Sequence, residues 1–164
     1  MSFTIDDILE IAEQIEKNGA AFYSKAACLV PFGWARNILL GLATEEIKHQ
    51  KVFSIMRVDL ALTRRNRAVP DGVEGEYLIA LAGECLFRRA DDSAAFFKSR
   101  KSLQSIIQTA ITKEKDSILL YIGLSSALAK PVDKKKVRNI LHQEQKHLST
   151  FVGLLNRMKK LGIK

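Results

Sequence analysis

Apolar residues recur every three or four positions along most of the chain, and this spacing puts them on one face of an α-helix. No segment has the strict alternation of apolar and polar residues that is typical of a half-buried strand. The pattern therefore predicts an all-α protein. Its four long helices are expected over about residues 5–29, 34–62, 100–129 and 133–160.

Prolines and one polar stretch separate these helical patterns. Thr4 and Asp7 have the spacing of a capping box at the start of the first helix. A connector over about residues 63–99 contains one short helical pattern within residues 73–89. Two short loops and one long connection predict a four-helix bundle with a long crossover between its second and third helices, which is the ferritin-like arrangement. We expect residues 1–164 to form one such domain.

Composition agrees with a folded chain, since 47% of the residues are apolar and 27% are charged. The chain has 26 Lys and Arg against 18 Asp and Glu, a net charge of +8 that would suit an anionic partner. The basic residues lie in short clusters without interleaved aromatic residues, so we expect a solvated surface and no nucleic-acid partner. These clusters are Arg64–Arg67, Lys134–Lys136 and Lys159–Lys160.

No apolar run is long enough for a membrane span, and acidic residues near the start argue against a signal peptide. Cys28 and Cys85 lie far apart and form no C-x-x-C motif, so we expect two reduced thiols in a cytoplasmic protein. Neither cysteine has a motif around it, and the same holds for Trp34. Packing is the expected role of all three.

The two halves of the chain repeat one polar pattern at an offset of 98 residues. Each half has a Glu, a Tyr seven residues later, and a Glu-x-x-His that begins thirty residues after the first Glu. The matched pairs are Glu16 with Glu114, Tyr23 with Tyr121, Glu46 with Glu144, and His49 with His147.

Helical spacing indicates that these polar residues point into the bundle. Glu46 and His49 fall within the apolar stripe of the second predicted helix, and Glu144 and His147 fall within that of the fourth. Glu114 is central in the stripe of the third predicted helix. Glu16 lies only at the edge of its stripe.

Four carboxylates and two imidazoles inside a bundle would be costly without a positive partner. Lysine and arginine are nearly absent from these stripes, so bound metal is the expected partner. Ferritin-like di-iron and di-manganese proteins use this set, a Glu from each of two helices and Glu-x-x-His from each of two others. We expect two iron ions, with manganese or zinc as substitutes.

Two roles are open for Tyr23 and Tyr121, which lie two turns after Glu16 and Glu114. They either pack in the core or hydrogen-bond the ligand carboxylates, and we favour the second role. His142 lies off the apolar stripe of its helix and is expected to face solvent.

Across essentially all four helices the chain resembles the rubrerythrin branch of the ferritin-like di-iron carboxylate superfamily. The resemblance implies a non-haem di-iron centre that reduces hydrogen peroxide, or reacts with dioxygen, with electrons from a rubredoxin-like donor. It implies single ligands at Glu16 and Glu114, bridges at Glu46 and Glu144, and terminal nitrogens from His49 and His147. The matching segments are Glu16-Lys-Asn-Gly-Ala-Ala-Phe-Tyr23, Glu45-Glu46-Ile-Lys-His49, Glu114-Lys-Asp-Ser-Ile-Leu-Leu-Tyr121 and Glu144-Gln-Lys-His147.

The chain departs from this family in two respects. It has no paired C-x-x-C motifs of a rubredoxin domain, so we expect a separate electron donor. Rubrerythrins also have an extra Glu three residues after the ligand of the third helix, and here that position is Ser117. A peroxidase mechanism that uses this Glu would need a glutamate of the connector in its place. The candidates are Glu74, Glu76 and Glu84.

Two other functions fit the sequence. The same site could oxidise ferrous ion and pass it to storage or to a partner. Storage would call for a large shell, whereas a rubrerythrin-like oxidoreductase is expected to be a homodimer. The chain could also be a metal-free helical adaptor for acidic partners. The sequence leaves open the oxidant, the donor and any exchange of a helix between subunits.

Overall fold

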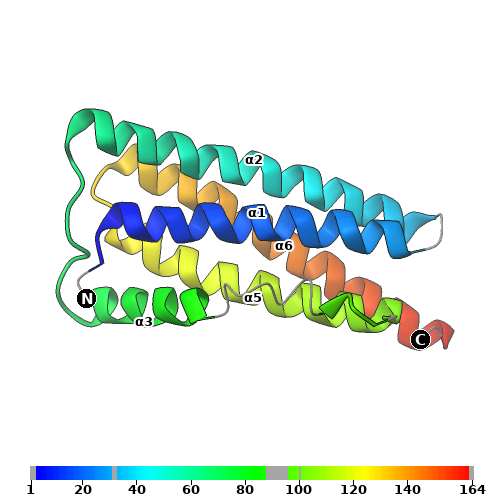
Figure 1. The fold of residues 1–164 in the computed structure, drawn as a ribbon. Helices are drawn as coiled ribbons and strands as arrows, with labels where there is room; N and C mark the ends of the chain where they lie inside the picture. The colour runs from blue at the N-terminus through cyan, green and yellow to red at the C-terminus, as the bar shows by residue number, and fades with distance from the viewer. Residues whose placement is uncertain (1–2, 31–32, 88–95, 100, 163–164) are drawn as a thin grey trace.

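The computed structural model describes residues 3–30, 33–87, 96–99 and 101–162. Within these ranges the chain is helical, without strands, as the sequence predicted (Figure 1). A short helix lies in the crossover, so the predicted four-helix bundle with a long connection is confirmed. The named helices are α1 (Ile5–Leu29), α2 (Trp34–Thr63), α3 (Val73–Phe87), α5 (Leu103–Ala127) and α6 (Pro131–Leu161).

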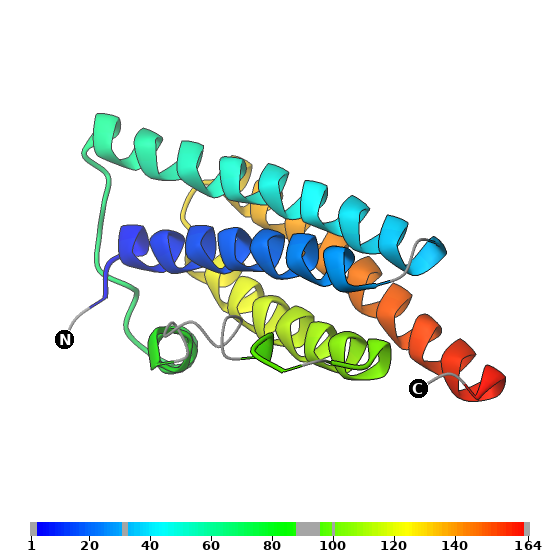
Figure 2. The ribbon, with the colours of Figure 1, turned by 45° about the vertical axis from the view of Figure 1, so that its right-hand side comes forward.

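The bundle consists of two antiparallel hairpins, because α1 packs chiefly on α2 and α5 packs chiefly on α6. Helix α2 ends at the end of the bundle where α1 begins, and α5 starts at the opposite end (Figure 1). The crossover therefore runs along the bundle. Its helix α3 lies against α5, as the turned view also shows (Figure 2).

Local sequence explains where the helices begin. The predicted capping box is present, with the Thr4 amide donating to Asp7 Oδ2 at 2.8 Å and the Asp7 amide donating to Thr4 Oγ1 at 3.3 Å. Helix α5 begins later than predicted, because the Ser102 side chain accepts the Ser105 amide and caps the helix there. Helix α6 begins earlier than predicted, since Pro131 occupies a first-turn position that needs no amide donor.

The first part of the crossover, after α2, lies beside the N-terminal segment and is hydrogen-bonded to it. The amide of Ile5 donates to the Arg67 carbonyl and the amide of Val69 donates to the Phe3 carbonyl, each at 2.9 Å. Arg67 belongs to a cluster expected to be only solvated, yet its guanidinium also donates to the Ala127 carbonyl at 2.8 Å. It thereby satisfies a carbonyl at the C-terminal end of α5.

The apolar core is divided in two along the bundle. One cluster contains Ile8 and Phe53, and the other contains Phe22 and Phe151. The repeated Glu and His residues come from sequence positions between the two clusters on all four long helices. Buried charge in mid-bundle opposes folding, so this polar layer indicates a function other than stability.

Two residues expected to pack are more exposed than predicted. Cys28 is exposed. Trp34 is 38% exposed, with the Arg157 guanidinium 5.5 Å from the centroid of its ring. Both lie next to the turn that joins α1 to α2, at the end of that hairpin. Cys85 packs against the core as expected. Within the described part of the chain, every helix is too short or too polar to span a lipid bilayer.

Candidate metal centre

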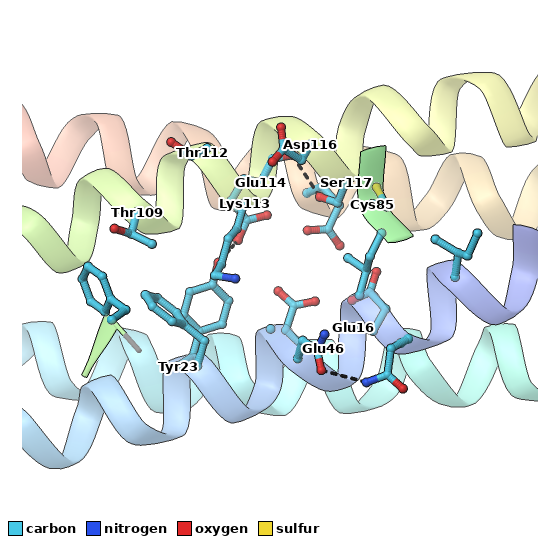
Figure 3. Close-up of a pocket in the computed structure, with 18 residues that line it drawn as sticks. Glu16, Tyr23, Glu46, Cys85, Thr109, Thr112, Lys113, Glu114, Asp116 and Ser117 are labelled. Carbon is cyan, nitrogen blue, oxygen red and sulfur yellow. Dashed lines mark hydrogen bonds between the residues drawn. The ribbon is translucent and has the colours of Figure 1, made fainter. Parts of the chain in front are cut away.

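The structure brings the six predicted ligand residues together in the middle of the bundle. None of them is more than 7% exposed. Glu16, expected at the edge of its stripe, is 1% exposed because α1 is covered by α2 on one side and by α5 on another. Glu16 and Glu46 point toward Glu114 across the site (Figure 3).

These residues form two overlapping groups, each of which could hold one metal ion. In each group, one ligand atom per residue lies within 4.8 Å of all the others. Glu46 and Glu144 belong to both groups, so they have the position of bridging ligands. The first group is completed by Glu16 and His49, and the second by Glu114 and His147.

The oxygens of the shared carboxylates divide between the two histidines. Glu144 Oε1 lies 2.7 Å from His49 Nδ1, and its Oε2 lies 3.3 Å from His147 Nδ1. Glu46 Oε2 lies 3.4 Å from His49 Nδ1, and its Oε1 lies 3.6 Å from His147 Nδ1. Each shared carboxylate thus offers one oxygen to each group, as a bridge between two ions requires.

Three buried atoms of this cluster lack a hydrogen-bond partner within the described part of the chain. They are His49 Nδ1, His147 Nδ1 and Glu144 Oε1. The 2.7 Å approach of His49 to Glu144 does not have hydrogen-bond geometry. Buried polar atoms are seldom left unsatisfied, and a lone pair of nitrogen that faces carboxylate oxygens suits a cation. The residues therefore fit a pair of metal ions.

Gln143 fixes the orientation of one histidine, and sequence reasoning missed it. His49 Nε2 lies 2.6 Å from Gln143 Oε1, and because this oxygen accepts, the ring proton lies on Nε2. In the neutral ring, His49 Nδ1 then turns its lone pair toward the carboxylates. The offset of 98 residues aligns Gln143 with Glu45, which could have drawn attention to it. Glu45 itself pairs with Lys48 Nζ at 2.7 Å, so the two halves are not symmetric here.

The two tyrosines hydrogen-bond ligand carboxylates across the repeat. Tyr23 donates its hydroxyl to Glu114 Oε1, and Tyr121 donates to Glu16 Oε1. Each tyrosine therefore bonds the glutamate of the other half, not the one two turns before it. The second oxygens, Glu114 Oε2 and Glu16 Oε2, face His147 and His49. Each single glutamate thus has one oxygen held by a tyrosine and one turned toward the metal groups.

Crowding of the carboxylates perturbs their protonation. Burial, together with the neighbouring Glu46, raises the pKa of Glu16 well above its usual value. Burial also raises the pKa of Glu114 to about 8, because its contact with His147 does not offset the loss of water and the repulsion by Glu144. For Glu144, burial acts in the same direction, but the two imidazole rings beside it, His147 and His49, outweigh burial and lower its pKa to about 2. In the absence of metal, the cluster therefore takes up protons.

The other residues weighed from the sequence lie outside the two groups. Ser117 is buried beside them and donates its hydroxyl to the Glu114 carbonyl at 2.9 Å. No glutamate of the described connector takes the place of the missing Glu, because α3 packs on the outside of α5 with its glutamates exposed. These are Glu74, Glu76 and Glu84. His142 is exposed, as predicted.

Comparison with known proteins supports the fold. No protein-family model matches the chain, and no curated protein matches it by sequence. Among solved structures, the chain is similar to the crystal structure of a proposed ferritin-like diiron-carboxylate protein from Thermotoga maritima. The two share 24% sequence identity with a TM-score of 0.71, over 95% of this chain and 97% of that one. The chain therefore has a ferritin-like fold.

Proposed function

We propose that this protein binds two iron ions through these six side chains and is an oxidoreductase of the rubrerythrin type. Its substrate would be hydrogen peroxide or dioxygen, and its electrons would come from an external, rubredoxin-like donor. The observation that carries the proposal is the pair of overlapping groups that share Glu46 and Glu144. The diiron-carboxylate description of the similar Thermotoga maritima protein supports it.

The charge of the site and the type of its ligand atoms favour two divalent ions such as iron or manganese. The four carboxylates carry four negative charges when ionised, which equal the four positive charges of two divalent ions. Oxygen-rich sites with one imidazole per ion suit iron or manganese better than a metal that prefers sulfur. Zinc and manganese are therefore substitutes that can probe binding without redox chemistry.

The protein's own residues hold and insulate the centre. When bound, two ferrous ions would supply the two electrons that, with two protons from solvent, reduce one hydrogen peroxide to two water molecules. Tyr23 and Tyr121 fix the single glutamates through their hydroxyl groups, and Gln143 fixes His49. The apolar clusters on either side of the layer limit access of water, which strengthens the electrostatic interactions within it. We further propose that the active form is a homodimer.

Two adjacent glutamates of α2 provide a matched test. Glu46 belongs to both metal groups, whereas Glu45 pairs with Lys48 outside them. Protein loaded anaerobically with ferrous ion should consume peroxide repeatedly when a reductant is supplied. Glu46→Gln should abolish this turnover, and Glu45→Gln should leave it unchanged.

The same assay separates the other functions. Consumption of ferrous ion without turnover of the reductant, in a large shell-like assembly, would favour iron handling over the proposed function. Normal metal binding by Glu46→Gln would contradict the proposed ligand set. Absence of metal from both the wild type and Glu45→Gln would leave the adaptor function.

A further inference from the structure

A cavity of about 260 Å³ lies beside the metal-ligating residues, lined chiefly by α1 and α5 (Figure 3). All four glutamates of the centre line it, and neither histidine does. The histidines come from α2 and α6. The cavity therefore meets the carboxylate side of the centre, away from the imidazole rings.

The walls of this cavity are largely apolar where they leave the carboxylates. Ile11, Ile15 and Phe22 line it from α1, and Phe96 lines it from the crossover. Gly19 and Ser117 are small, so they leave room next to the glutamates. An added Cβ at Gly19 would already lie 3.4 Å from Glu46 Cγ.

Two of the polar side chains in the lining, Gln14 and Lys113, contact neighbouring residues of the wall. Gln14 donates to Asn18 Oδ1 at 2.7 Å, and the Lys113 ammonium lies 5.2 Å from the centre of the Phe22 ring. Asp116 also lines the cavity and has the opposite charge to Lys113, so these two wall residues add no net charge. A ligand held by these walls would be bound mainly through apolar contacts.

The volume is larger than peroxide or dioxygen needs. A water molecule takes about 30 Å³ of liquid volume, and an apolar cavity of about 150 Å³ is enough to bind benzene. Binding sites for small molecules combine apolar walls with a few convergent polar groups, which here are the glutamates of the floor. Two divalent ions would also cancel the charge of those glutamates, so neither an anion nor a cation is favoured as the ligand.

We propose that this cavity binds a small, neutral, largely aromatic or alkyl organic molecule against the carboxylate side of the metal centre. The presence of metal ions at the floor of the cavity rests on the proposed function, whereas the cavity and its walls do not depend on it. It adds an organic ligand to a site whose proposed substrates are peroxide and dioxygen.

The test uses indole as the probe and titrates it calorimetrically into metal-free and zinc-loaded full-length protein. One indole per chain is expected. Thr109 lines the cavity from α5, so Thr109→Phe should fill the cavity and weaken indole binding at least about tenfold. Thr109→Val, whose new side chain has about the size of threonine, should leave indole binding unchanged. Ile15→Phe on the opposite wall should repeat this result, with Ile15→Leu as its control.

Thermal unfolding and metal content of each variant keep the outcomes distinct. Folded wild-type protein that binds no indole, with or without zinc, would overturn the inference. Indole binding that both filling variants leave unchanged would also overturn it, because the probe would then bind elsewhere. Indole binding by protein that takes up no metal would contradict the proposed function and support the cavity.

Discussion

Replacement of Glu114 by glutamine should separate metal binding from folding. Burial raises the pKa of Glu114 to about 8, so at neutral pH this residue holds a proton in the metal-free protein. Glutamine has nearly the shape of the protonated acid, and its oxygen can still accept the Tyr23 hydroxyl. Metal-free Glu114→Gln should therefore be as stable as the wild type near pH 7. It should bind metal only in the group that contains Glu16 and His49.

The expected size of the effect follows from the number of ions bound. One ion at a hundredfold excess over its dissociation constant stabilises the folded state by about 2.7 kcal/mol. For a chain of this size, each 1 kcal/mol raises Tm by roughly 2–4 °C, so one ion raises it by roughly 5–11 °C. The wild type binds two ions and should gain about twice as much. Glu114→Gln should gain about half of the wild-type increase, and Glu144→Gln, which removes a shared ligand, should gain little.

Thermal unfolding with and without manganese measures these shifts free of redox chemistry. The control is Glu45→Gln, which changes a carboxylate outside both groups and should keep the full increase. A full increase in Glu114→Gln would refute the assignment of Glu114 as a ligand. Loss of folding in metal-free Glu114→Gln would refute the argument that this residue is protonated there.

Three further predictions concern the groups around the ligands. Tyr121→Phe leaves the buried Glu16 without its hydroxyl donor, so it should lower the free energy of unfolding by about 1–3 kcal/mol, measured by urea denaturation. The number of bound metal ions should stay the same, and an unchanged free energy of unfolding would contradict the prediction. Gln143→Leu should weaken the binding of one metal ion roughly 10–100-fold, measured by calorimetry, whereas Gln143→Glu keeps an acceptor for His49 and should restore the affinity. Equal affinities in the two variants would argue against a positioning role for Gln143. Because the pKa of Glu114 is raised from 4.5 to about 8 on folding, protonation of this residue stabilises the folded metal-free protein below pH 4.5, and this contribution is lost as the pH rises to about 8. The Tm of the metal-free protein should therefore fall between pH 4.5 and 8, while the increase in Tm on adding metal grows. A metal-free Tm that rises over this range would contradict the assigned protonation.

The site was predictable because it depends on helical spacing and on an internal repeat. Residues three or four positions apart share a helix face, so Glu46 and His49 could be assigned to the core from the sequence alone. The repeat then supplied the matching pair, Glu144 and His147. The structure brings both pairs together, while their function as metal ligands stays a prediction.

What the sequence did not reveal depends on contacts between helices. The bond from His49 to Gln143 joins α2 to α6, and no spacing along one helix indicates it. The burial of Glu16 depends on how closely α2 and α5 approach α1, so its place at the edge of a stripe was misleading. The tyrosines were expected near ligand carboxylates, but the exchange between halves follows from the antiparallel packing of the helices.

Counting metal ions is the most direct test of the central claim, that six side chains from four helices form one two-metal centre. Metal-free protein would be titrated with ferrous ion under anaerobic conditions, and the iron bound per chain would be measured, followed by one equivalent of peroxide. The account predicts two tightly bound ions per chain and rapid appearance of a ferric charge-transfer band in the near ultraviolet. Absence of tight iron binding, or unchanged binding by Glu46→Gln, would contradict it.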